Sequence, residues 1–240
     1  MTANERLERY LRAEMEKLRV PRRQAESAAK PRPFVTISRQ AGAGGHSLAD
    51  VMLEVFEQQP DRETFSGWHI VDHNIRDMVS DDPLIVGSLD SLLAEEYRSP
   101  ATDFFHQVIR STAHQDLVMA RVFQAIRSLA IIGKVIIIGR AGSQVTATLP
   151  VGMRLRLVAP DDLRVSRIME QQGYDERHAR GEMKKLDASR ARLLANHFNT
   201  DIDDPLGYDV VWNSESTSPT EISEAVLAMI RRRLSESTAS

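Results

Sequence analysis

FVTISRQAGAGGHSLAD, residues 34–50, passes from an apolar run into a cluster of glycines and then into a stretch with helical periodicity. Glycine reaches left-handed backbone conformations at little cost, so such a loop can turn successive N–H groups inward around an anion. The N-terminus of the following helix adds partial positive charge at the same point. The stretch therefore predicts a polyphosphate-binding loop. Its binding residues would be Gly42, Ala43, Gly44, Gly45, His46 and Ser47.

The loop departs from the phosphate-loop signature G-x-x-x-x-G-K-[ST] at two informative positions. Arg39 stands at the first glycine, and Gly45 stands at the lysine. One interpretation is a kinase that works without that lysine. The others are a loop that binds phosphate without chemistry and a turn without any ligand. Arg39 is the candidate replacement, because a guanidinium gives phosphate a planar, bidentate contact; pairing with a surface carboxylate is its alternative role.

Short apolar runs alternate with helical stretches along most of the chain. The runs span residues 34–38, 68–72, 134–139, 153–159 and 208–213. Helical patterns cover residues 73–131, 161–196 and 219–234. Near-continuous apolar strands separated by helices are typical of a parallel sheet covered on both faces. The pattern predicts one α/β domain over residues 33–234 and a disordered tail at 235–240.

Residues 1–32 stand apart from this domain. NERLERYLRAEMEKLRV places apolar side chains from Leu7 to Leu18 on one helical stripe, and Pro21 ends the pattern before a linker. Packing against its own domain is one interpretation of this amphipathic helix. The other is docking, either to a second copy in a homodimer or to another partner.

Composition excludes several classes of protein. The net charge of −3 gives no general electrostatic case for nucleic acid, and the absence of cysteine excludes disulfides and thiolate chemistry. No apolar run is long enough to span a membrane, and the N-terminus lacks the apolar core of a signal peptide. The chain is therefore expected to be cytoplasmic, without nucleic-acid or membrane partners.

Three further stretches carry a resemblance to a known family. They are GWHIVDHN (67–74), VIIIGRAGSQV (135–145) and the region from RLVAPDDLRVSRI (156–168) through KKLDASRARL (184–193) to YDVVWNS (208–214). With the glycine loop, they resemble the divergent cytidylate-kinase-like family, whose loops also lack the lysine. The resemblance covers about residues 34–232.

This resemblance implies a P-loop fold with a five-stranded parallel sheet and helices on both faces. It also implies an acceptor-binding helical insert at about 73–131 and a mobile lid at about 170–200. Such proteins transfer phosphoryl groups from ATP, with Mg²⁺, to a nucleoside monophosphate. Two alternatives remain open: a nucleotide-binding sensor or partner protein with impaired catalysis, and a P-loop kinase for another small molecule.

The resemblance also assigns substrate-binding residues. Arg140 matches the arginine of the family's EGRD-like segment and would hold the acceptor's phosphate, and Asp72 matches the aspartate of the WHLLDSG-like segment. Asp72 would orient the acceptor or metal-bound water, with a helix cap as its alternative role. Two acidic residues of the EGRD-like pattern are lost, at Ile138 and Ala141. These losses weaken the expected Mg²⁺ anchor and the expected preference for CMP.

The lid segment supplies the remaining candidates. Asp187 and Arg190 match the R-D-x-D-x-x-R lid pattern, Asp187 as a substrate-binding residue and Arg190 as a cation that reaches the phosphates on closure. Arg167 lies one turn after Arg164 at the lid's entrance, on the ATP side. The predicted catalytic cations are therefore Arg39, Arg190 and Arg167. For Arg190 and Arg167, a solvated charge on a helix surface is the alternative.

Overall fold

The computed structural model describes Arg9, residues 32–72 and residues 114–237. The predicted N-terminal helix and the first part of the predicted insert lie outside these residues. Within the described ranges, no helix combines the length and apolar character needed to cross a bilayer.

The centre of the described chain is a five-stranded parallel sheet, as predicted, and its strand order is β2-β3-β1-β4-β5. The strands are β1 (Phe34–Arg39), β2 (His69–Val71), β3 (Val135–Ile138), β4 (Gly152–Val158) and β5 (Val210–Asn213). The strand before the glycine loop, β1, is central and pairs with both β3 and β4. Because all strands run the same way, the loop shares one sheet edge with the ends of the other strands.

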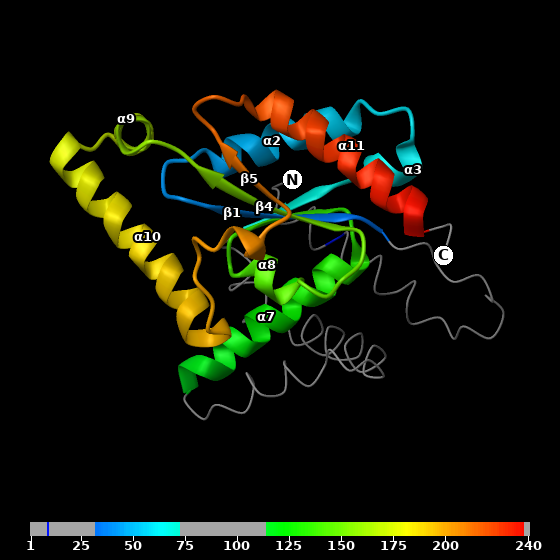
Figure 1. The fold of residues 1–240 in the computed structure, drawn as a ribbon, viewed down its shortest axis with the longest axis horizontal. Helices are drawn as coiled ribbons and strands as arrows, with labels where there is room; N and C mark the ends of the chain where they lie inside the picture. The colour runs from blue at the N-terminus through cyan, green and yellow to red at the C-terminus, as the bar shows by residue number, and fades with distance from the viewer. Residues whose placement is uncertain (1–8, 10–31, 73–113, 238–240) are drawn as a thin grey trace.

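Helices cover both faces of this sheet (Figure 1). One face carries α2 (Gly45–Glu57), α3 (Arg62–Phe65) and α11 (Pro219–Ser237), and the other carries α7 (His114–Ile132) and α8 (Gly142–Val145). Strand β1 alternates between the two layers: Val35 and Ile37 pack in the α2 cluster, and Phe34 packs in the α7 cluster. Alternate side chains of a strand are buried on opposite faces of the sheet. Because both faces are covered, the strands appear in the sequence as nearly continuous apolar runs.

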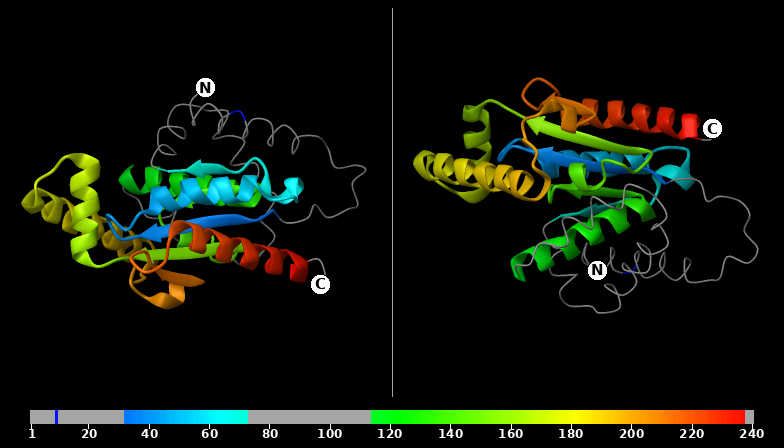
Figure 2. Two further views of the ribbon diagram at one scale, coloured as in Figure 1. Left: turned by 90° about the horizontal axis from the view of Figure 1, so that it is seen from above. Right: turned by 60° about the horizontal axis from the view of Figure 1, so that its bottom comes forward.

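Two helices extend beyond the carboxyl ends of the strands, next to the glycine loop (Figure 2). They are α9 (Asp161–Gln172) and α10 (Glu176–Phe198), with Gly173 ending α9 at a φ of 70°. A short 3₁₀ helix, η1 (Pro205–Gly207), follows before β5. The charged stretch predicted as helical over 161–196 therefore forms two helices with a glycine break.

Two predicted boundaries need correction. Helix α7 buries Phe123, Ile126 and Leu129 in the core of the sheet, so residues 114–131 belong to the central domain and not to an insert. Helix α11 continues to Ser237, three residues into the predicted disordered tail at 235–240. Helical periodicity identified both segments, but it does not say which layer a helix joins.

Candidate active site

The glycine loop has the backbone of an anion cradle. Gly42 and Gly44 lie in the left-handed region, with φ of 76° and 88°, and α2 begins at Gly45. No side chain caps this helix, and its first turn carries no acidic residue. The first backbone N–H groups of α2 therefore have no capping side chain, which suits the binding of a phosphate. His46 and Ser47 are exposed at the same point.

Arg39 takes the space that a lysine at position 45 would need. A Cβ atom placed on Gly45 would lie 3.1 Å from Cγ and 3.3 Å from Cδ of Arg39. The guanidinium continues to Gly139 after β3, where a Cβ atom would lie 2.0 Å from its Nη1. The stem of Arg39 thus packs over Gly45, and its charge arrives between the glycine loop and the end of β3.

Three arginines converge beside the loop. Arg39, Arg140 and Arg190 line a small pocket together with Ser38, Ser143 and an apolar wall. We call these three residues the arginine cluster. The described residues that line this pocket include no carboxylate. The pocket is therefore suited to an anion with an apolar portion.

The arginine cluster is electrostatically strained. Burial, followed by repulsion from Arg190, lowers the pKa of Arg39 from 12.5 to about 10, although Asp72 partly opposes this effect. Burial also lowers the pKa of Arg190. A cation with a lowered pKa in the folded state destabilises the fold at every pH below that value, and the effect is relieved only as the pH rises from about 10 towards 12.5. At neutral pH, a bound anion would offset this unfavourable charge.

The turn that presents Arg140 is backbone-strained. Gly139, Arg140 and Ala141 follow β3 with φ of 75°, 54° and 56°. Side chains disfavour this left-handed region by about 1–2 kcal/mol per residue. Such conformations persist where surrounding structure imposes them, often at functional sites. Here they direct the chain so that residues 139–143 form one wall of the pocket.

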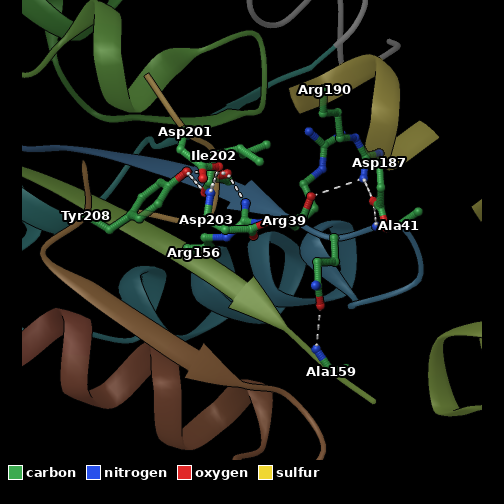
Figure 3. Close-up of polar contacts among 12 residues, drawn as sticks. Arg39, Ala41, Arg156, Ala159, Asp187, Arg190, Asp201, Ile202, Asp203 and Tyr208 are labelled. Atoms are coloured by element: carbon green, nitrogen blue, oxygen red, sulfur yellow. Dashed lines mark hydrogen bonds and ion pairs between the residues drawn. The ribbon is translucent and has the colours of Figure 1, made fainter. Parts of the chain in front are cut away.

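Asp187 binds protein groups, although the sequence predicted a substrate contact (Figure 3). Its Oδ1 accepts a hydrogen bond from the backbone N–H of Ala41 at 2.7 Å, and its Oδ2 accepts one from Arg164 at 2.6 Å. It is not among the residues that line the pocket. The carboxylate joins α10, α9 and the glycine loop, and its role in substrate binding stays a prediction.

Arg190 is held over the end of β1. Its Nη1 donates to the carbonyl oxygen of Arg39 at 3.1 Å and lies 3.7 Å from Oδ1 of Asp187 (Figure 3). Helix α10, in the region predicted as a lid, thus brings a cation to the end of β1, and the phosphate contact of Arg190 stays a prediction. Nothing in the sequence pattern pointed to the Asp187–Ala41 contact, because it joins residues 146 positions apart.

Arg167 lies away from the arginine cluster. Its Nη1 contacts the carbonyl oxygen of Gly42 at 3.4 Å and Oγ of Ser214 at 3.1 Å, and its Nη2 donates to the Ser214 carbonyl oxygen at 3.1 Å. These bonds tie α9 to the loop and to the turn after β5. The predicted catalytic role of Arg167 stays a prediction, and the geometry gives it a positioning role.

Arg156, which is 3% exposed on β4, was not among the predicted site residues. Its guanidinium donates to Ser38 at 3.0 Å, pairs with Asp203 and lies over the ring of Tyr208 (Figure 3). Tyr208 in turn donates to the carbonyl oxygen of Ile202. The sequence feature that could have identified Arg156 is a charged residue within an otherwise apolar strand. Arg156 fixes Ser38 and the segment before β5 at the pocket's edge.

The acidic position lost from the EGRD-like segment is buried. Ile138 is 1% exposed and packs in the apolar cluster under α2. A metal contact from this side chain is therefore excluded. Nearby, Nε2 of His46 lies 2.6 Å from Oδ2 of Asp72, so the residue in the signature's hydroxyl position is an imidazole bonded to a carboxylate. These residues do not match the all-oxygen donor set that Mg²⁺ prefers.

Comparison with known proteins agrees with this architecture. Residues 34–216 match the model of the cytidylate kinase-like family. The chain belongs to this family. No curated protein matches it.

The chain also aligns with solved structures. An uncharacterised protein from Eubacterium ventriosum aligns with a TM-score of 0.61 at 20% sequence identity. The alignment covers 84% of this chain and 100% of that protein's chain. A shikimate kinase from Bacteroides thetaiotaomicron aligns with a TM-score of 0.43 at 10% sequence identity. That alignment covers 84% of this chain and 98% of the kinase chain. The alignment with the Eubacterium ventriosum protein shows that this cytidylate kinase-like chain and that protein have the same fold.

Gly44→Ala is expected to weaken ATP binding strongly, because the loop must keep a left-handed residue with its N–H groups facing the anion. A Cβ atom at this position meets only Arg167, at 3.6 Å, so the substitution causes no steric clash. It therefore tests whether the left-handed backbone conformation is needed. The backbone cost is about 1–2 kcal/mol. Gly67→Ala is the matched control, with φ of 76° and no neighbour within 4 Å. Calorimetric titration with ATP measures both variants. Unchanged affinity in Gly44→Ala would show that the loop holds no polyphosphate.

Arg190→Ala is expected to lower kcat by about 10²–10³-fold, the usual effect of removing one donor to a developing negative charge. Its effect on ATP affinity should be much smaller. Arg180→Ala is the control, because Arg180 lies on the same helix and pairs with Glu176 and Asp162 at the surface. Steady-state kinetics and nucleotide titrations measure the two effects. Equal kinetic losses in both variants would contradict a phosphate contact.

Proposed function

We propose that this protein transfers the γ-phosphoryl group of ATP to a small phosphorylated acceptor, with a nucleoside monophosphate as the expected substrate. The glycine loop would bind the donor's phosphates. The arginine cluster would lie between donor and acceptor, where the phosphoryl group moves. Catalysis of this kind is mainly positioning and charge stabilisation, so it needs cations and no protein nucleophile.

The observation that carries this proposal is the path of Arg39. Its stem covers Gly45, and its guanidinium reaches the end of β3 beside Arg140 and Arg190. A cation therefore lies beside the position from which the signature lysine would extend. The charges of Arg190 and Arg140 both repel that of Arg39 at this point, and Asp72 offsets this repulsion only in part. A phosphate anion would complete the site.

A nucleotide scan tests this function. ATP, ADP and the nucleoside monophosphates are screened by thermal shift, and turnover is then measured on those that bind. A ligand at about 100 times its Kd should stabilise the protein by roughly 2.7 kcal/mol. ATP binding with transfer to a monophosphate supports the proposal. Transfer only to a non-nucleotide acceptor would correct the substrate, in line with the loss at Ala141.

The second candidate function is nucleotide sensing without turnover. It is favoured by Ile138, an apolar residue at the position where the EGRD-like pattern has an acidic one that would act on the metal. Clear ATP binding combined with no phosphoryl transfer to any acceptor would favour this function over the kinase.

A further inference from the structure

His46 and Asp72 form a pair at the mouth of the glycine loop. Nε2 of His46 lies 2.6 Å from Oδ2 of Asp72, although the residues come from α2 and from the end of β2. The His46 side chain is 60% exposed, and that of Asp72 is 18% exposed. His46 occupies the position at which the phosphate-loop signature has the hydroxyl that binds Mg²⁺. The pair thus lies where the metal of a bound nucleotide belongs.

Asp72 also acts on the arginine cluster. Its negative charge opposes the lowering of the pKa of both Arg39 and Arg190. The pair is therefore adjacent to the cations that would contact the transferring phosphoryl group. A metal ion held there would share the same phosphate oxygens.

The donor atoms of the pair suit a transition metal better than Mg²⁺. Mg²⁺ takes oxygen ligands in near-octahedral geometry, whereas imidazole favours ions such as Co²⁺, Fe²⁺ and Zn²⁺. Metal–ligand bonds of about 2.0–2.2 Å at a right angle place two donors roughly 3 Å apart. The 2.6 Å separation of the two atoms would need only a small opening to admit an ion.

We propose that His46 and Asp72 are the protein ligands of a divalent metal site that prefers a borderline transition metal over Mg²⁺, with the remaining positions filled by nucleotide phosphate oxygens and water. This inference rests on the proposed function, since the phosphates complete the site. Among the described residues, no group of three or more potential metal ligands occurs, so His46 and Asp72 would be the two ligands that the protein itself supplies.

The test uses Co²⁺ as the probe, because its visible absorption reports nitrogen ligation directly. The protein is titrated with Co²⁺ in the presence and absence of ADP, and with Mg²⁺ as competitor. His46→Ser restores the hydroxyl of the signature, and Asp72→Asn removes the carboxylate. His178→Ser is the matched control, because His178 is exposed on α10 and stacks on Tyr174.

His46→Ser should weaken Co²⁺ binding in the ADP complex by about tenfold or more, shift the absorption spectrum and leave or improve Mg²⁺ binding. Asp72→Asn should weaken both ions, and His178→Ser neither. An unchanged preference for Co²⁺ over Mg²⁺ in His46→Ser overturns the inference, even where ADP binds normally. Absence of any ADP-induced thermal shift counts instead against the proposed function. In that case, absorption by Co²⁺ alone decides the metal site: dependence on His46 supports it, and independence overturns it.

Discussion

Replacing Arg39 with alanine is expected to lower kcat by about 10³-fold or more, the range for a single arginine that stabilises phosphoryl transfer. The affinity for ATP should change far less, because the contact strengthens in the transition state. The Arg39 backbone carbonyl, which accepts a hydrogen bond from Arg190, is kept in this variant. The variant therefore removes the charge and the packing of the side chain over Gly45, and keeps the backbone contact.

The measurement is steady-state turnover with the acceptor found in the nucleotide scan, together with ATP titration. Arg62→Ala is the control, because Arg62 is an exposed arginine on α3 that pairs with Glu57 of α2. A loss confined to KM would show that Arg39 contributes to ground-state binding alone. An unchanged kcat would remove Arg39 from the proposed mechanism.

Gly45→Lys is expected to have opposite effects in two backgrounds. In the parent protein, the new Cβ atom would lie 3.1 Å from Cγ of Arg39 and push that side chain away from Gly139, so kcat should fall roughly tenfold. In the Arg39→Ala protein, the space is free and lysine would supply the missing cation. There kcat should rise about tenfold or more.

A double-mutant cycle measures this coupling, since contacting residues are not additive. Gly181→Lys controls for the added charge, because position 181 on α10 has no neighbour within 4 Å of a new Cβ atom. If Gly45→Lys acts in the same direction in both backgrounds, Arg39 does not replace the lysine.

The fold was predictable from local patterns. Apolar runs of strand length between helical stretches indicated a parallel sheet, and the glycine cluster marked the turn from β1 into α2. Arg39 was placed beside the loop because it ends that strand. These features depend on backbone preferences and on side-chain periodicity, which neighbouring residues encode.

The composition of the site was only partly predictable. Arg140 and Arg190 were identified, and the fold brings them together with Arg39. Arg156 was missed, and Asp187 turned out to bond Ala41 and Arg164. The assignment of residues 114–131 to the acceptor-binding insert was wrong, because helical periodicity does not show which part of the protein a helix packs against.

The amino-acid order alone established the strand–loop–helix unit, the loss of the loop's lysine and the presence of an arginine near it. Packing of distant segments decided that the stem of Arg39 covers Gly45 and that its guanidinium meets Gly139, 100 positions away in the chain. It also decided that His46 meets Asp72. The physical reason is that backbone conformation depends on adjacent residues, whereas charge placement at a sheet edge depends on strand order and on the close packing of side chains from different elements.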